Sequence, residues 1–349
     1  MCISLMIINR LAQGMNRRLF TLIIVALFTF GNDIKAQEKE EFKPYGRAFG
    51  RIFANFHEGI SEASSEDAAF DLVRAYLGYE HFLSEEFSAK INVDIGSPND
   101  LSEFSKIRRY AYFKNAYVQY KKSGLTYQFG LISLKQFDLQ ETIWERRYMK
   151  KTFADEYKLG SSADLGMMAE YKFSDIFSAD VTMMNGEGYS SLQSDDIFKY
   201  AAGATFTPFK SLLLRGYCDY MKDEVAQITP VALISYTYKG NFNIAGEYNY
   251  QFNNNHKEQQ DLYGYSVFGK YNLNKKLQLF ARYDQLSSNI PDEKTTPWQL
   301  SKDGTTLIGG IQFAPIKGIK VALDYQDWYP RAANMPNKSY IFLDLEVRL

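Results

Sequence analysis

The sequence predicts an all-β fold: a transmembrane antiparallel up-and-down β-barrel of about sixteen strands, with short periplasmic turns and long external loops. First, apolar and polar residues alternate in short segments from Tyr45 onward, as in strands with one apolar face. Second, the connections between these segments alternate in length. Third, the chain ends on such a segment, Tyr340–Leu349, whose free edge needs a partner strand. In a closed barrel the partner is the first strand, here Tyr45–His57.

The alternating segments are near the length that a tilted membrane strand needs. They lie near 45–57, 69–82, 87–94, 109–120, 125–131, 164–173, 177–184, 199–207, 212–220, 229–238, 242–250, 262–271, 277–283, 305–313, 319–326 and 341–349. The short connections are 83–86, 121–124, 174–176, 208–211, 239–241, 272–276 and 314–318. The longer, polar ones are 58–68, 95–108, 132–162, 185–198, 221–228, 252–261, 284–304 and 327–338. Seven short and eight long connections place both chain ends on the short-turn side, as in outer-membrane barrels.

The positions of the charges indicate which face of each strand meets lipid. An Arg or Lys on the lipid face near the midplane costs about 2–4 kcal/mol. The basic residues of the strands fall on the polar face, which we therefore expect to line the lumen: Arg47, Arg51, Arg74, Lys90, Arg215, Arg282, Lys320 and Arg348. The apolar face carries aromatic residues that we expect beside the short turns, as an interfacial girdle: Tyr79, Phe87, Tyr120, Tyr171, Phe173, Phe177, Tyr220, Tyr238, Phe242, Tyr271, Tyr283 and Phe313.

The N-terminus has the pattern of an export signal. Arg17 and Arg18 precede the apolar run 19–30, and Ala36 offers a small residue for cleavage before Gln37. The run is too short to span a bilayer as a helix, although a buried or anchoring helix is the alternative interpretation. We expect a signal peptide over 1–36, with translation starting at Met15, and a barrel over 37–349 in the outer membrane of a Gram-negative cell.

Charge and cysteine content exclude some classes of protein. Without residues 1–36 the chain has 36 basic and 40 acidic residues, a balance that argues against a nucleic-acid binder. Cys2 falls within the predicted signal, so Cys218 is alone and no intramolecular disulfide is expected.

Four short stretches resemble the phosphate-selective porin O/P family. They are Lys114-Asn115-Ala116-Tyr117-Val118-Gln119-Tyr120, Tyr127-Gln128-Phe129-Gly130, Trp144-Glu145-Arg146-Arg147 and Ala163-Asp164-Leu165-Gly166. The resemblance implies passive diffusion of small hydrophilic solutes, with anions such as phosphate favoured. It also implies a homotrimer, no cofactor, and assembly by the barrel-assembly machinery through the C-terminal strand.

The longest external loop, 132–162, contains the predicted constriction residues. In porins the third loop folds into the barrel, and the resemblance implies the same here. Its centre is basic, with Arg146, Arg147, Lys150 and Lys151 against Glu145. Basic residues of the wall are expected to face it: Arg47, Arg51, Arg74 and Arg215. Guanidinium groups stay charged and bind phosphate or carboxylate oxygens in a fork. These eight residues are therefore predicted to contact small anions in the pore.

An alternative interpretation gives the same charges a structural role. They would pair with acidic residues of the wall and only stiffen it; the possible partners are Glu80, Asp164, Glu170, Asp180 and Glu247. The residues alone leave both interpretations open.

Two other classes of function compete with a pore. A lipid hydrolase needs a nucleophile beside a base, but the only histidines are His57, His81 and His256, and no G-x-S-x-G motif occurs. No His/Cys cluster has the spacing of metal ligands. A non-conducting structural or adhesive barrel would need a blocked lumen, and only residues 37–44 precede the first strand as a possible plug. We expect a porin rather than an enzyme.

Overall fold

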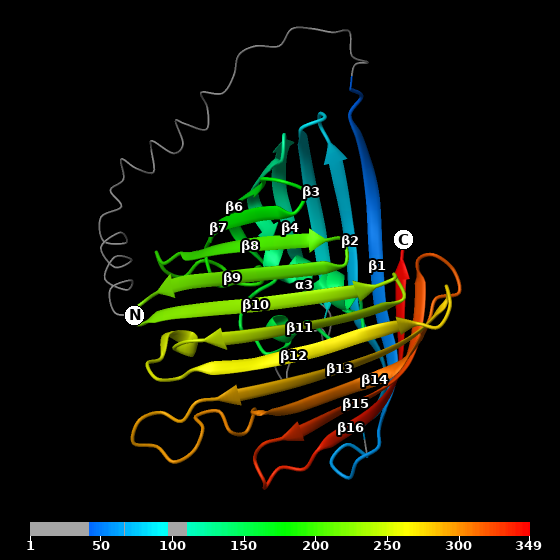
Figure 1. The fold of residues 1–349 in the computed structure, drawn as a ribbon, viewed down its shortest axis with the longest axis vertical. Coiled ribbons are helices and arrows are strands. Elements are labelled where there is room, and N and C mark those ends of the chain that lie inside the picture. The colour runs from blue at the N-terminus through cyan, green and yellow to red at the C-terminus, as the bar shows by residue number, and fades with distance from the viewer. Residues whose placement is uncertain (1–41, 66, 97–109) are drawn as a thin grey trace. The chain divides into compact units, whose positions relative to one another are not determined.

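The computed structural model describes residues 42–65, 67–96 and 110–349. They form one closed barrel of sixteen antiparallel strands, each hydrogen-bonded to its neighbours in the chain, with the last strand pairing with the first (Figure 1). The predicted fold class and strand number are confirmed. The predicted signal peptide lies outside the described residues. Among the described residues, no helix is long and apolar enough to cross a membrane.

The strands lie where the alternation places them. They are β1 Tyr45–Gly59, β2 Ala68–Phe82, β3 Phe87–Gly96, β4 Tyr110–Lys122, β5 Leu125–Ser133, β6 Ala163–Lys172, β7 Phe177–Met184, β8 Lys199–Phe209, β9 Leu212–Lys222, β10 Ala226–Tyr238, β11 Phe242–Gln251, β12 Leu262–Asn272, β13 Leu277–Ser288, β14 Gly304–Phe313, β15 Ile319–Pro330 and β16 Lys338–Arg348. In the described loops there are three helical segments: α3 Lys135–Trp144, α4 Phe153–Glu156 and the 3₁₀ turn η1 Asn254–His256.

The connections separate by length as predicted, with one exception. Two of the short turns contain only two residues each, 210–211 and Ser123-Gly124. In the latter φ is +48° and +85°, and two positive φ values are typical of a type I′ hairpin. At the other end, β9 and β10 extend beyond their predicted ends and pair as far as Lys222 and Ala226. The predicted long connection 221–228 is therefore wrong, and only 223–225 join these strands.

The seam between β1 and β16 closes the sheet in the predicted antiparallel direction. Arg51 lies opposite Arg348, and Asn55 lies opposite Asp344. The amide of Leu349 donates to the Gly50 carbonyl at 2.9 Å, so the seam stays paired to the last residue. Every strand edge is paired, which leaves no backbone groups unsatisfied at a free edge in lipid.

The two faces of the strands separate as predicted. Charged residues on alternate positions, such as Arg215, Glu247 and Arg282, are buried inside the barrel, while Leu343 and Val267 on the apolar face are exposed to the outside. Most predicted girdle aromatics lie beside short turns. Two do not: Tyr220 lies near the external end of β9, and Tyr283 lies midway along β13. A strand of eleven or twelve residues reaches both interfaces, so alternation alone does not tell the two ends apart.

Val267 tests this assignment because it is an outward residue in the middle of β12. We expect Val267→Arg to destabilise the barrel: the free energy of unfolding in lipid should fall by about 2–4 kcal/mol, since the variant places a guanidinium in hydrocarbon. The control is Gln128→Arg on the inner face of β5, which we expect to fold almost normally. The measurement is unfolding by urea in lipid vesicles. Equal losses for both variants would contradict the assigned faces.

Candidate functional site: the lumen and its inner loop

The segment 134–162, between β5 and β6, lies inside the barrel. One face of its helix α3 packs against the barrel wall, and the other face borders the open part of the lumen. Phe137, Gln140 and Trp144, spaced three and four residues apart, are buried against the wall. Asp138 and Glu141, three residues apart, lie on another face, and Glu145 follows directly after the helix as its cap, with φ +60°.

Apolar contacts attach this segment to the inner wall in two groups. One contains Phe137, Phe153 and Leu159 together with Met168 and Leu286 of the wall. In the other, the Trp144 ring meets Phe268 edge-on, with ring centroids 5.3 Å apart. These clusters are the main apolar cores of the described barrel, and both join the loop to the wall.

Polar anchors on the wall fix the position of α3. Arg215 of β9 donates to both carboxylate oxygens of Asp180, at 2.7 and 3.0 Å, and to the Gln136 side chain at 2.8 Å. Gln140 donates to Glu247 of β11. Arg215 and Asp180 are fully or almost fully buried, so their charges are neutralised within the wall rather than by a solute.

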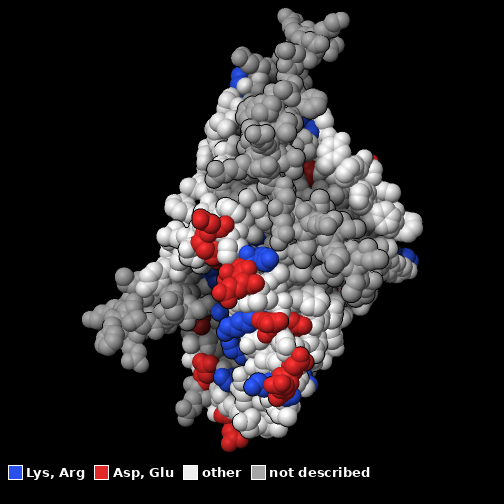
Figure 2. Space-filling model, turned by 90° about the vertical axis from the view of Figure 1, so that its left-hand side faces the viewer, with Lys and Arg blue, Asp and Glu red and all other residues white. Residues whose placement is uncertain are grey.

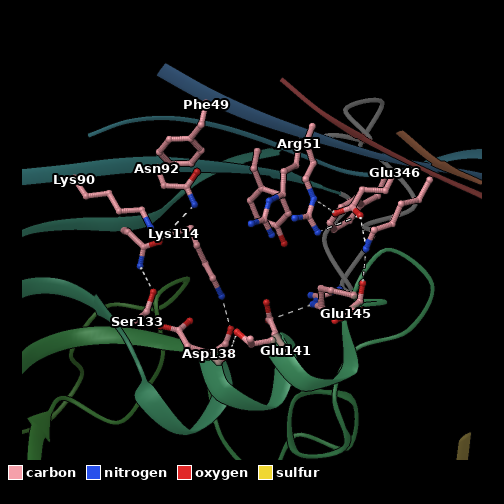
Figure 3. A pocket seen from close by; sticks show the side chains of 18 residues that line it. Phe49, Arg51, Lys90, Asn92, Lys114, Ser133, Asp138, Glu141, Glu145 and Glu346 are labelled. Carbon is pink, nitrogen blue, oxygen red and sulfur yellow. Dashed lines mark hydrogen bonds and ion pairs between the residues drawn. The ribbon is translucent and has the colours of Figure 1, made fainter. Parts of the chain in front are cut away.

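The free face of α3 borders a cavity of about 710 Å³. The carboxylates of Asp138 and Glu141 point toward the strands on the far side of the cavity (Figure 3). The Glu145 carboxylate instead pairs with Lys270 of β12 at 2.5 Å. The opposing wall carries Arg51 from β1, Lys90 from β3 and Lys114 from β4. Carboxylates and cations therefore face each other across open space, an arrangement that produces an electric field across the cavity.

The cavity lining contains six basic and four acidic residues, and several of them are paired. The basic set is Arg51, Lys90, Lys114, Arg147, Lys320 and Arg348; the acidic set is Asp138, Glu141, Glu145 and Glu346. Arg147 pairs with Glu141 at 3.5 Å, and Arg348 and Lys320 pair with Glu346 at 2.8 and 3.3 Å. Among the described residues, Arg51, Lys90, Lys114 and Asp138 form no ion pair in this lining. Glu145 pairs with Lys270 of β12, which lies outside the lining. The unpaired charges of the lining are thus three positive and one negative.

Lys114 is held in place by two neutral groups. Its ammonium donates to the Ser162 hydroxyl and lies 4.2 Å from the centre of the Tyr189 ring. Tyr189 comes from the external connection 185–198, and its hydroxyl donates to Asp94 at 3.1 Å. Asp164 holds the start of that connection by accepting bonds from the amides of Gly186 and Gly188.

Two groups of the inner loop that line the cavity have shifted pKa values. Asp138 is open to water in the cavity, but the surrounding wall withdraws it from bulk solvent. This desolvation, together with the nearby Glu141, raises its pKa to about 6 although three lysines oppose the shift. For Arg147, burial acts to lower the pKa, but the neighbouring Tyr76, Asp155 and Glu141 prevail and raise it, so its positive charge is permanent.

The structure places the eight predicted anion-contact residues in different environments. Arg51 and Arg147 line the cavity. Arg47 is exposed near the short-turn end and pairs with Glu80 at 2.6 Å, while Arg74 pairs with Asp94 at 2.7 Å. Arg215 is the buried anchor described above. Their proposed contact with solute anions stays a prediction.

The remaining three lie on the inner loop. Arg146 is buried against the wall, 4.6 Å from the centre of the Phe280 ring, and donates to Gln278 at 2.9 Å. Lys150 pairs with Glu156 at 2.9 Å, and Lys151 lies 3.8 Å from Asp155. Of the four basic residues at the centre of the loop, Arg147 alone lines the 710 Å³ cavity.

Sequence reasoning missed part of the lining. Lys90, Lys320 and Arg348 were assigned to the lumen face by alternation but not to the site. Lys114 was noted only within a resembling stretch, and the acidic face of α3 was not recognised. The spacing of Asp138 and Glu141 is the available signal, because it places two carboxylates on one helical face.

A closed sixteen-stranded antiparallel barrel with an inward-folded loop has the fold of outer-membrane porins. No protein-family model and no curated protein matches the chain. Several solved structures of outer-membrane proteins are similar. OmpT of Vibrio cholerae, expressed in the outer membrane, has a TM-score of 0.63 and 13% identity over 89% of this chain and 99% of that chain. An anion-selective porin from Comamonas acidovorans has a TM-score of 0.63 and 9% identity over 88% and 100%. The outer membrane channel DcaP of Acinetobacter baumannii has a TM-score of 0.61 and 12% identity over 88% and 99%. A trimer form of OmpT also matches, with a TM-score of 0.57. At these identities the likeness establishes the fold.

The Arg215–Asp180 pair gives a test of the anchor. We expect Arg215→Met to destabilise the barrel by about 3–5 kcal/mol, because it leaves the Asp180 carboxylate buried without its partner. The double variant Arg215→Met/Asp180→Leu should recover most of this loss. Urea unfolding in lipid vesicles measures both. A single variant as stable as the wild type would show that the pair does not hold the wall and α3 together.

Proposed function

We propose that this protein is an outer-membrane porin that passes small hydrophilic solutes by diffusion and favours small anions. The observation that carries the proposal is the cavity between α3 and β1–β4, whose unpaired charges are three cations against one carboxylate. A charged constriction in a wet barrel selects ions by the sign of its lining. Phosphate is one anion that guanidinium groups can hold in a fork, and it is the natural first test solute.

The alternatives have less support from the described residues. His57 is close to Asn55 and Asp67, and His256 is close to the Val225 carbonyl, so their recorded partners include no serine that could act as a nucleophile. A non-conducting barrel would require the inner loop to fill the lumen, whereas α3 leaves an open cavity beside it. Assembly as a homotrimer belongs to the proposal, and the trimer form of a similar structure supports it.

The proposed selectivity depends on Arg51 and Lys90. We expect Arg51→Gln/Lys90→Gln to lower the anion-to-cation permeability ratio by at least about twofold, because it removes two of the three unpaired cations. The readout is the reversal potential of single channels in a KCl gradient, repeated with phosphate on one side. The control, Lys239→Gln/Lys276→Gln, removes two charges at short turns outside the cavity lining and should leave the ratio unchanged.

Three outcomes would contradict the proposal. A purified barrel that carries no current is not a porin. A wild-type channel that prefers cations has the wrong selectivity. A loss that is equal in the control pair would mean that net charge, rather than the cavity, sets the ratio.

The titration of Asp138 should make the anion selectivity depend on pH. With a pKa of about 6, its carboxylate is charged at pH 7.5 and mostly neutral at pH 5. Lowering the pH through this range removes the unpaired negative charge of the lining, so the preference for anions should rise. We expect Asp138→Asn to show the higher preference already at pH 7.5 and to lose the step near pH 6. A wild-type step that persists in this variant would assign the titration to another group.

A further inference from the structure

A second cavity, of about 870 Å³, lies on the other side of the inner loop. Tyr157 and Lys158 from the end of that loop line it. Trp328 at the end of β15, Tyr340 at the start of β16 and Lys302 in the connection 289–303 line it from the barrel. These elements belong to the long-loop end of the barrel, and the two cavities share no lining residue. This second cavity is the external vestibule.

The aromatic rings of the external vestibule are held in fixed positions. The Tyr157 hydroxyl is 2.8 Å from the Thr306 hydroxyl, and Tyr340 donates to Asp67 at 3.0 Å. Trp328 packs so closely on Gly304 that an added Cβ there would lie 2.7 Å from the indole. The rings of Tyr157 and Trp328 are 6.4 Å apart and inclined by 38°. Because the hydroxyls are bonded to the wall, the apolar ring surfaces are the parts left for a ligand.

The charge of the external vestibule is positive. Four lysines and two acidic residues line it. Lys150 is neutralised by Glu156, and Asp327 accepts bonds from Tyr325 and Asn337. Lys158, Lys302 and Lys338 are exposed, and within the described residues they form no ion pair. Figure 2 shows the end of the barrel toward which the arrows of β9, β11 and β13 point in Figure 1. On its described part, basic and acidic side chains are interleaved.

Neutral polar groups complete the lining. The side chains of Gln299 and Ser301 line the external vestibule and have no recorded partner among the described residues. A carboxamide and a hydroxyl can each donate and accept, which suits a ligand that carries many hydroxyl groups. A small inorganic anion would use the lysines but not the rings. A neutral sugar would use the rings and amides but not the lysines.

We propose that the external vestibule binds acidic saccharides: hydroxyl-rich rings that carry carboxylates, such as short uronic-acid oligomers. The sugar faces pack on Trp328, Tyr157 and Tyr340, the carboxylates meet Lys158, Lys302 and Lys338, and the hydroxyls bond to the neutral polar groups. The binding site stands on its own geometry, whereas its role in delivering solute to the pore rests on the proposed function.

The test is binding of trigalacturonic acid to the full barrel in detergent, measured by isothermal titration calorimetry. Maltotriose supplies the rings without the charge, and acetate supplies the charge without the ring. We expect trigalacturonic acid to bind more tightly than either, with an affinity that falls as salt is added.

Two variants separate the contributions of charge and ring. Lys158→Gln/Lys302→Gln/Lys338→Gln should weaken trigalacturonic acid binding about tenfold and leave maltotriose unchanged. Trp328→Ala should weaken both sugars. The matched control is Lys239→Gln/Lys275→Gln/Lys276→Gln, which removes three lysines at short turns outside the external vestibule and should bind as the wild type does.

Binding no tighter than that of acetate or maltotriose, or equal binding by the triple vestibule variant, would overturn the inference. Single-channel recording on the same preparations keeps it distinct from the proposed function. A barrel that conducts but does not bind trigalacturonic acid overturns the vestibule assignment alone. A barrel that binds it but carries no current overturns the porin assignment alone.

Discussion

The attachment of segment 134–162 to the inner wall determines how the lumen is divided. A barrel of sixteen strands is too wide for its own side chains to fill. Here the loop fills one side of the lumen, and both main apolar clusters of the described residues join loop to wall. The Arg215–Asp180 pair, bonded to Gln136, fixes the start of α3. Without this attachment the strands would still pair, but the lumen would have no defined constriction.

The attachment of α3 to the wall also determines which of its charged side chains face the 710 Å³ cavity. Gln140 and Trp144 turn toward the wall, so Asp138 and Glu141 must turn toward the cavity. The wall opposite carries Arg51, Lys90 and Lys114 on inward positions of three strands. The separation of charge across the cavity therefore follows from two periodicities, that of a helix and that of a strand, once the helix is attached.

The sequence predicted the strands well because alternation is a local signal that lipid enforces at every second residue. Strand number, faces and the β1–β16 seam follow from it. The environments of individual cations do not. Arg146 and Arg147 are adjacent, yet Arg146 packs against Phe280 and Arg147 lines the cavity. Their difference depends on which wall residues the loop meets after the barrel closes. The strand alternation likewise places Arg215 on the lumen face as a free cation. Only its contacts with Asp180 and Gln136 show that it anchors α3 to the wall.

The inner loop also links the two cavities physically. Asp138 and Glu141 border the constriction, while Tyr157 and Lys158, on the same loop, border the external vestibule. Between them, Arg147 contacts Glu141 and Asp155, and Arg282 of β13 donates to the Lys151 carbonyl at 2.6 Å. A solute that pushes on one side of the loop therefore acts on contacts that also position the other side. Because these contacts are charged and largely buried, the loop is a firm partition between the two cavities.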